Sequence, residues 1–212
     1  DVYKRQGESD CKKINDKLIY ASINGFGDSG PYSTAPAYDH VVQAMSGIMQ
    51  TTGTEDMGPV KVGAPYVDYA TGLNAAFAIM AALRERDRTA GPQTVNVAML
   101  DTALNLMANN LVTTATTGNE TPKLGNEAAS RAPSSGCFEA GDGVLLMLAA
   151  NNERQFADLC GVLGHPEWVE DERWRQPRQR AENQQALRAV IENVFRHRSA
   201  AECETLLDQA GV

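Results

Sequence analysis

The sequence predicts an α/β protein, in which a mostly parallel sheet is accompanied by a second, smaller α/β unit. Short apolar runs rich in strand-forming residues, such as residues 18–23, alternate with longer segments of helical periodicity. Residues 18–23 are apolar on both faces, which is typical of a strand in a parallel sheet covered on both sides. The order strand, helix, helix, strand, helix over the first part of the chain supports the same fold class.

In the first part of the chain, the predicted strand at 18–23 is followed by a Gly-rich loop. The later predicted elements are a helix at 38–49, a polar loop at 50–59, a helix from Asp68 to about Arg88, a strand at 93–99 and a helix at 101–117. In the helix that begins near Asp68, four apolar residues share one face, and we expect them to pack against the core: Leu73, Phe77, Met80 and Ala81.

The second part of the chain begins with a predicted strand at 144–149 and a helix at 153–163, with Gly164 just past the helix end. Cys160 falls on the apolar face of this helix, so we expect it in the core. The remaining elements are an irregular charged segment at 166–180, a helix at 181–197 and a last helix opened by the capping-box pattern Ser199 to Glu202.

Four segments follow from these patterns. We expect residues 1–6 to be a foreign leader, 7–124 to belong to a large domain, 125–143 to form a junction loop and 144–212 to belong to a small α/β domain. The junction assignment depends on the Gly-, Pro-, Ser- and Asn-rich composition of that stretch.

Composition limits the function classes. The chain has 212 residues, a formal net charge of -8 and 42% hydrophobic residues, so it has enough apolar residues for a core and lacks the basic balance of a general nucleic-acid binder. No apolar run reaches 18 residues, so we expect no membrane span. The four cysteines form no CxxC pair and the three histidines are scattered, so we expect no metal site and a reducing, cytoplasmic compartment.

Asp68 is the carboxylate around which the first part of the chain is organised. It follows a Gly/Pro turn and directly precedes a helical apolar pattern, so it lies at or near a helix N-terminus. Asp is among the preferred N-cap residues, and capping its own helix is one interpretation. The other is a functional carboxylate that faces a cleft.

Several separated motifs occur in an order that resembles the class III CoA-transferase family, which includes formyl-CoA transferase, the carnitine CoA-transferase group and the α-methylacyl-CoA racemases. The motifs are Gly25-Phe26-Gly27, Tyr38 to Gly47, Thr52-Gly53, Val62 to Gly72, Val95 to Asp101, Leu124-Gly125-Asn126, Ala132-Pro133 and Ala149 to Asn152. The resemblance extends from about Leu18 to Val212.

The resemblance implies a large Rossmann-like domain, a smaller α/β domain and a homodimer of two interlocked chains. It implies coenzyme A as a substrate, with an acyl-CoA and a carboxylic acid as reaction partners, and no metal. It also implies that this chain is an internal fragment, which lacks the first strands and the C-terminal segment of a complete family member.

The resemblance places the family's catalytic carboxylate at Asp68, which in the transferases attacks the acyl-CoA thioester. In the racemases a His occupies the position of Tyr38. Since a Tyr phenol has a pKa of about 10, this favours a transferase. The free N–H groups of a helix N-terminus are suited to stabilising the oxyanion formed on attack. The substrate- or CoA-binding candidates are Tyr38, Asp39, Gly25, Phe26, Gly27, Asn126 and Arg131.

Each secondary candidate also has a plain structural interpretation. Asp39 suits the first turn of a helix, where a carboxylate is favoured by the helix dipole. Tyr38 suits a half-buried packing position, and the glycines of the loop suit a turn. Asn126 and Arg131 suit a plain connection in the junction loop. For the whole chain, the alternatives to a CoA-transferase are an acyl-CoA racemase or epimerase, and a non-catalytic fragment that supports dimer assembly.

Overall fold

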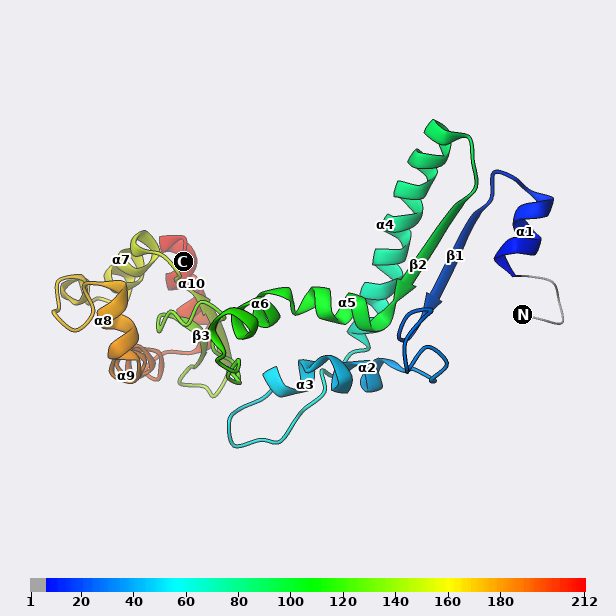
Figure 1. Cartoon of the computed structure of the whole chain (residues 1–212). Coiled ribbons are helices and arrows are strands. Elements are labelled where there is room, and N and C mark those ends of the chain that lie inside the picture. Colours follow the sequence, from blue (N-terminus) through cyan, green and yellow to red (C-terminus); the bar gives the residue numbers. More distant parts are fainter. Residues whose placement is uncertain (1–6) are drawn as a thin grey trace. The chain divides into compact units, whose positions relative to one another are not determined.

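The computed structural model describes residues 7–212, so the expected leader at 1–6 lies outside the described residues (Figure 1). The chain divides into two compact units, the first ending at Lys123 and the second spanning Leu124–Val212. The mixed α/β class expected from the sequence is confirmed in both units, each of which combines helices with a two-stranded sheet among the described residues.

The first unit is built on two parallel strands. Its elements are α1 (Glu8–Ile14), β1 (Ile19–Asn24), α2 (Asp39–Ser46), α3 (Ile48–Thr51), α4 (Tyr66–Thr89), β2 (Gln93–Ala98), α5 (Met99–Leu106) and α6 (Ala108–Thr117). Strands β1 and β2 pair in parallel from Ile19 opposite Gln93 to Asn24 opposite Ala98. The helix α4 lies along both strands, as in a βαβ crossover (Figure 1).

Two predicted helices are each divided in the structure. The helix expected at 38–49 is split into α2 and α3 by Gly47, whose φ of 87° is a left-handed conformation that glycine adopts without steric cost. The helix expected at 101–117 begins earlier, at Met99, and is interrupted at Met107. Apolar periodicity continues across both breaks, so it did not reveal them.

The prediction for the buried face of α4 is wrong. Leu73 and Phe77 are 74% and 75% exposed, and Met80 and Ala81 are exposed as well. The buried face carries small side chains instead, including Ala75 and Ala82, which pack against Val95 and Val97 of β2. Small residues let the helix axis approach the strands closely, and the bulky apolar residues are left on the opposite side.

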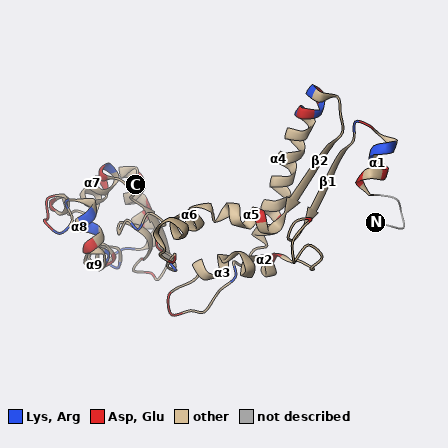
Figure 2. Cartoon of the chain, viewed as in Figure 1, with Lys and Arg blue, Asp and Glu red and all other residues tan. Residues whose placement is uncertain are grey.

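The outer face of α4 is apolar because its charged residues are confined to the two ends. From Tyr69 to Leu83 the helix contains no charged residue, and the charges gather in its last two turns (Figure 2). Tyr69 is 68% exposed and lies one turn before Leu73. The 3.6-residue period was therefore read correctly, but with the wrong side facing the sheet.

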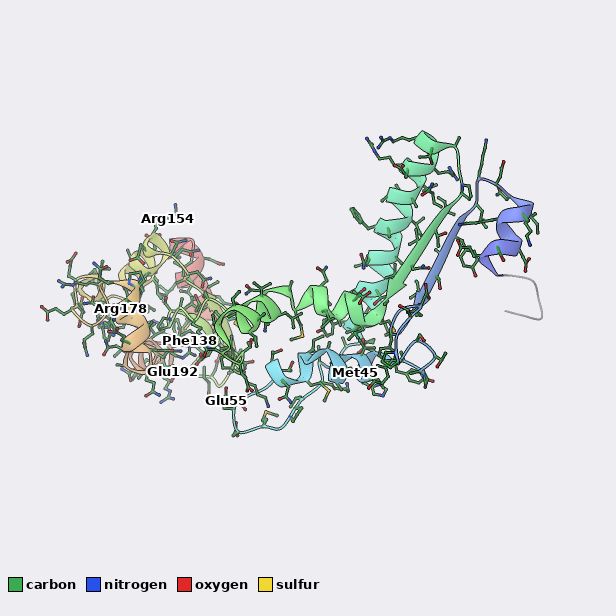
Figure 3. All side chains as sticks on the ribbon, in the orientation of Figure 1. Met45, Glu55, Phe138, Arg154, Arg178 and Glu192 are labelled. Atoms are coloured by element: carbon green, nitrogen blue, oxygen red, sulfur yellow. The ribbon has the colours of Figure 1, made fainter. Side chains whose placement is uncertain are left out.

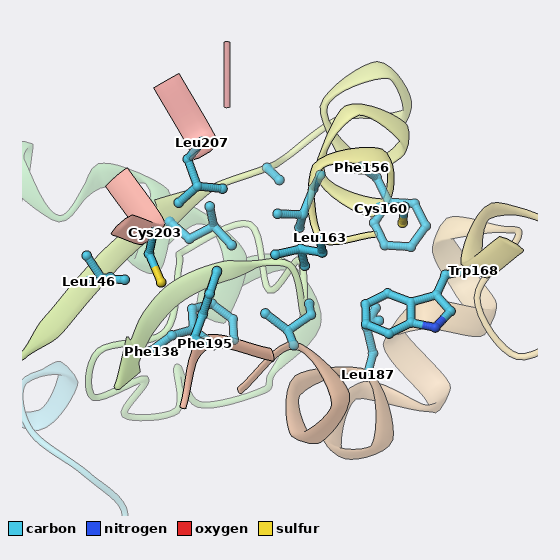
Figure 4. Close-up of a cluster of buried hydrophobic side chains, with 14 of the residues drawn as sticks. Phe138, Leu146, Phe156, Cys160, Leu163, Trp168, Leu187, Phe195, Cys203 and Leu207 are labelled. Carbon is cyan, nitrogen blue, oxygen red and sulfur yellow. The ribbon is translucent and has the colours of Figure 1, made fainter. Parts of the chain in front are cut away.

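The second unit packs helices against an antiparallel pair of strands. Its elements are β3 (Ser135–Glu139), β4 (Leu145–Ala149), α7 (Glu153–Val162), the 3₁₀ helix η1 (Pro166–Val169), α8 (Pro177–Glu182), α9 (Gln184–Phe195) and α10 (Ala200–Ala210). Its core joins side chains from both strands, from η1 and from α7, α9 and α10, among them Phe138, Leu146, Phe156, Cys160, Trp168, Leu187, Phe195, Cys203 and Leu207 (Figure 4). The core position expected for Cys160 is confirmed.

Two expectations in the second unit need correction. The segment expected to be a junction loop at 125–143 contains β3, which a Ser-Gly-Cys composition did not suggest. The segment expected to be irregular at 166–180 contains η1 and the start of α8, and it contributes Trp168 and Trp174 to the core, with their rings 5.7 Å apart. The two large aromatic side chains stabilise a chain segment whose polar residues hide any periodicity.

Helix caps in the second unit follow the sequence signals. The capping box is confirmed, since the Ser199 hydroxyl accepts from the Glu202 N–H and the Glu202 carboxylate accepts from the Ser199 N–H. Gly164 has a φ of 83°, as expected for the residue past a helix end.

Candidate active site

Asp68 is the third residue of α4, inside the first helical turn. The N-cap position belongs to Pro65, so the interpretation of Asp68 as the N-cap is wrong. Asp68 is exposed, and no group within residues 7–212 forms a hydrogen bond or an ion pair with its carboxylate. A carboxylate in a first turn is favoured by the helix dipole. Asp68 therefore combines a fixed backbone position with a side chain that is free to react.

The cap of α4 comes from Asp39, the first residue of α2. Its Oδ2 atom accepts hydrogen bonds from the backbone N–H groups of Val67 (2.8 Å) and Asp68 (3.1 Å). Asp39 is only 8% exposed. Asp39 does lie in a first turn, as the sequence indicated, but its carboxylate serves the N-terminus of a different helix.

Gln43, one turn after Asp39, completes this arrangement and was missed by the sequence analysis. It is fully buried, its Nε2 donates to Oδ1 of Asp39, and its Oε1 accepts from the N–H of Val62 at 2.8 Å. A signal was present, since polar residues at 39, 43 and 46 follow one face of α2, and that face is the buried one.

The first-turn N–H groups of α4 are all engaged. Besides the two N–H groups bound to Asp39, the N–H of Tyr66 donates to the carbonyl of Ala64 (2.8 Å) and the N–H of Tyr69 donates to that of Pro65 (3.3 Å). The expectation that free N–H groups of this terminus stabilise an oxyanion is therefore wrong. Any oxyanion formed next to Asp68 needs donors from elsewhere.

Two tyrosines flank the capping contact. Tyr38 is the N-cap residue of α2 and 68% exposed, and its ring stacks on that of His40 at 6.0 Å, so the half-buried packing interpretation is wrong. Tyr66 opens α4, and burial raises the pKa of its phenol, to which the negative charge of Asp39 adds. The Tyr66 hydroxyl therefore stays protonated near neutral pH.

The loop after β1 is fixed next to the first turn of α4. A Cβ atom on Gly25 would lie 2.2 Å from the Cβ of Ala37, so only glycine fits there, and Gly27 has a φ of 90°. Phe26 packs in the same apolar cluster as Val67. The loop, Asp39 and Asp68 thus gather near the carboxyl end of β1, the edge of a parallel sheet where α/β proteins bind ligands.

Asn126 and Arg131 belong to the second unit. Both are exposed, and Arg131 has a φ of 55°, an uncommon conformation for a residue with a side chain. The Asn126 carbonyl accepts from the N–H of Cys137 at 3.0 Å, which links this loop to β3. A role of these residues in substrate binding stays a prediction.

A groove of about 660 Å³ lies elsewhere in the first unit, between α3, α6 and residues 120–123. Two of its charged residues already have protein partners: Lys123 Nζ donates to the carbonyl of Gly58 (2.7 Å), and Glu55 accepts from the Lys123 N–H (3.0 Å). Glu55 lies on the loop after α3 (Figure 3). None of the predicted site residues lines this groove, so it is not the candidate active site.

Comparison with solved structures places this fold in a defined group of α/β proteins. The chain is similar to a CAIB/BAIF family protein from Brucella suis, with a TM-score of 0.81 and 33% identity over 98% of this chain and 55% of that one. It is also similar to Rv3272 from M. tuberculosis, with a TM-score of 0.84 and 30% identity over 98% of this chain and 54% of that one.

Sequence comparison assigns the family. The model of CoA-transferase family III matches residues 5–212, and the chain belongs to this family. It is 37% identical to the acetyl-CoA:oxalate CoA-transferase of Acetobacter aceti over 94% of this chain and 51% of that protein. It is 34% identical to the succinyl-CoA:glutarate CoA-transferase of Mus musculus over 97% of this chain and 47% of that protein. The chain therefore spans about half the length of the curated relatives it matches.

One further property concerns membranes. Among residues 7–212, no helix combines the length and the apolar character needed to cross a bilayer.

Proposed function

We propose that this chain carries the catalytic centre of a CoA-transferase, which moves CoA from an acyl-CoA to a carboxylic acid through a covalent intermediate on Asp68. The observation that carries the proposal is the free, exposed carboxylate of Asp68 on a rigidly capped helix turn, in a chain of CoA-transferase family III. The curated relatives named above act on acyl-CoA and carboxylate pairs, which supports the same substrate classes here.

The reaction balances without a proton donor. A carboxylate oxygen of Asp68 attacks the thioester carbonyl of the acyl-CoA, the C–S bond breaks, and a mixed anhydride and CoA thiolate form. The thiolate attacks the Asp68 carbonyl, which releases the donor acid and leaves an aspartyl-CoA thioester. The acceptor carboxylate then attacks this thioester, which gives a second mixed anhydride and releases CoA thiolate. The thiolate attacks the acyl carbon of the acceptor, which forms the new acyl-CoA and regenerates the Asp68 carboxylate.

The geometry fits this chemistry in two respects. The nucleophile must be ionised and unpaired, and Asp68 has no partner among the described residues while it lies in a first turn, where negative charge is favoured. The surrounding backbone must stay fixed as the adduct forms, and Asp39 and Gln43 hold the first turn from a buried position. We propose that the hydrogen-bond donors for the oxyanion come from other parts of the whole protein, and that the whole protein is a homodimer.

Trapping tests the proposal. The full-length protein is mixed with an acyl-CoA, the adduct is cleaved with hydroxylamine or reduced with borohydride, and the modified peptide is identified by mass spectrometry. We expect modification at Asp68, and loss of CoA transfer in Asp68→Asn. Asp87→Asn is the matched control, because Asp87 is an exposed carboxylate at the other end of the same helix. Normal turnover in Asp68→Asn would refute the mechanism.

A racemase and a non-catalytic assembly role make different predictions. A racemase exchanges the α-proton of the acyl group with deuterium from solvent, whereas a transferase exchanges CoA between acids. Tyr38, in the position where the racemases of the family have a His, favours the transferase. An assembly role predicts that the 212-residue chain by itself catalyses neither exchange reaction and shows no CoA binding in calorimetry, so tight binding of CoA by this chain alone would count against that role.

A further inference from the structure

The polar contacts between α2 and the start of α4 suggest a further role in the proposed reaction. We infer that Asp39 and Gln43 are a pair of positioning residues, which hold the first turn of α4 so that Asp68 is presented without a partner. This inference rests on the proposed function of Asp68.

Both residues are buried, and in each of their hydrogen bonds the donor and the acceptor are fixed by the chemistry of the two groups. Asp39 is 8% exposed and Gln43 is fully buried. Oδ2 of Asp39 accepts from two backbone N–H groups of α4, one of them that of Asp68 itself, and Oδ1 accepts from the amide of Gln43. Gln43 in turn holds the N–H of Val62, in the segment that leads into α4. The pair therefore fixes both the helix start and the chain that enters it.

The same contacts account for the freedom of the Asp68 carboxylate. A carboxylate in the first turn of a helix commonly bonds to unpaired N–H groups nearby. Here the N-cap residue is Pro65, which has no N–H, and the N–H groups of the first turn are already bound, two of them to Asp39. The local partners that would draw the Asp68 side chain back onto its own helix are removed, and its oxygens stay available for an external electrophile.

The chemistry of the pair allows its two side chains to be exchanged. In Asp39→Asn alone, the new amide must point its NH₂ group at the donor of Gln43 or at the N–H groups of α4. In Gln43→Glu alone, two carboxylates face each other without a donor between them. In the double variant Asp39→Asn/Gln43→Glu, the new amide accepts from α4 and donates to the new carboxylate, which still accepts from Val62. All these hydrogen bonds are then restored, but in the bond between the side chains of residues 39 and 43 the donor is now residue 39 and the acceptor is residue 43.

The test is a double-mutant cycle in the full-length protein, with the rate of adduct formation on Asp68 measured in a single turnover with acyl-CoA. We expect each single variant to slow this step by about 10- to 100-fold, the range caused by small misplacements of reacting groups. The KM for acyl-CoA should change by less than about threefold, since both side chains are buried and their polar atoms are hydrogen-bonded within the protein. We expect the double variant to recover to within about fivefold of the parent protein.

A control and three outcomes decide the inference. Gln50→Glu makes the same chemical change on the exposed surface of α3 and should leave the rate unchanged. If the double variant is as slow as the slower single variant, Asp39 acts through its own charge and the positioning role is refuted. A full rate in Gln43→Glu refutes it as well. If the parent protein forms no adduct on Asp68, the proposed function itself fails. The contact between residues 39 and 43 is then measured by thermal unfolding, as the difference between the effect of the double variant and the summed effects of the two single variants.

Discussion

Replacing Asp39 by alanine should destabilise the first unit far more than the loss of an ordinary surface carboxylate. The substitution removes the acceptor of three N–H donors: the backbone N–H groups of Val67 and Asp68 and the side-chain amide of Gln43. Val67 and Gln43 are fully buried, so their donors lose their partner without access to bulk water. Asp68 is exposed, and water can replace the acceptor there.

The magnitude follows from these three donors. Leaving a buried donor without a partner costs about 1–3 kcal/mol, so the two buried donors together give about 2–6 kcal/mol. The exposed donor adds the loss of a helix cap, about 0.5–2 kcal/mol. Since a water molecule that enters the space left by the carboxylate recovers part of this free energy, we expect the lower half of the summed range, about 2.5–5 kcal/mol.

Urea unfolding measures the effect with two probes. The protein has two tryptophans, Trp168 and Trp174, and both lie in the second unit, so tryptophan fluorescence reports on that unit while circular dichroism reports on both. We expect Asp39→Ala to lower the unfolding midpoint of the circular dichroism component that fluorescence does not follow. The control is Asp101→Ala, an exposed first-turn carboxylate in α5, whose removal should cost less than about 1 kcal/mol. Equal losses in the two variants would refute the capping argument.

Three further predictions concern separate features. Burial raises the pKa of the Cys160 thiol to about 11, so at pH 8 a thiol reagent should modify the partly exposed Cys11 at least tenfold faster than Cys160 in the native protein, and equal rates would contradict the core position. Hydrogen bonds within the capping box hold the pKa of Glu202 below its ordinary value, so its contribution to stability is present above the unfolded pKa of about 4.3 and is lost as pH falls through the folded pKa. The difference in unfolding free energy between the parent protein and Glu202→Gln should therefore shrink in acid, and a constant difference would argue against the box. Gly25→Ala should lower the thermal midpoint, because its methyl group would meet Ala37 at 2.2 Å, and an unchanged midpoint would show that the loop can move away.

The sequence predicted the order of most elements and the place of Asp68 at the start of a helix, because both depend on local signals, whereas its candidate role as nucleophile came from the family resemblance. The strand at β1, the start of α4 and the capping box of α10 are each marked by a few neighbouring residues. The side of α4 that faces the sheet was assigned wrongly, since periodicity gives the angle between residues but not which face is buried. The face of α4 that packs on β2 carries alanines, because the close approach of the helix to the strand leaves no room for the larger and more hydrophobic side chains of the other face.

The candidate site was only partly predictable for a related reason. Asp68 could be located from the turn that precedes it, whereas its environment depends on α2, a helix much earlier in the chain. The bonds from Asp39 to α4 join residues 28 and 29 positions apart, and no pattern of neighbouring residues encodes such a contact. Gln43 was overlooked because a polar residue on an amphipathic helix is ordinarily assigned to the solvent side.

The cap supplied by Asp39 also has a consequence for the order of folding. A helix whose N-cap side chain bonds to its own N–H groups can form its first turn from local interactions, but the N-cap residue of α4 is Pro65, which provides no side-chain cap. Its first turn is complete only once α2 has docked, so a peptide covering α4 alone should fray at its N-terminal end. The turn that bears Asp68 is therefore acquired late, and a nascent or partly unfolded chain does not yet hold this carboxylate in a fixed place.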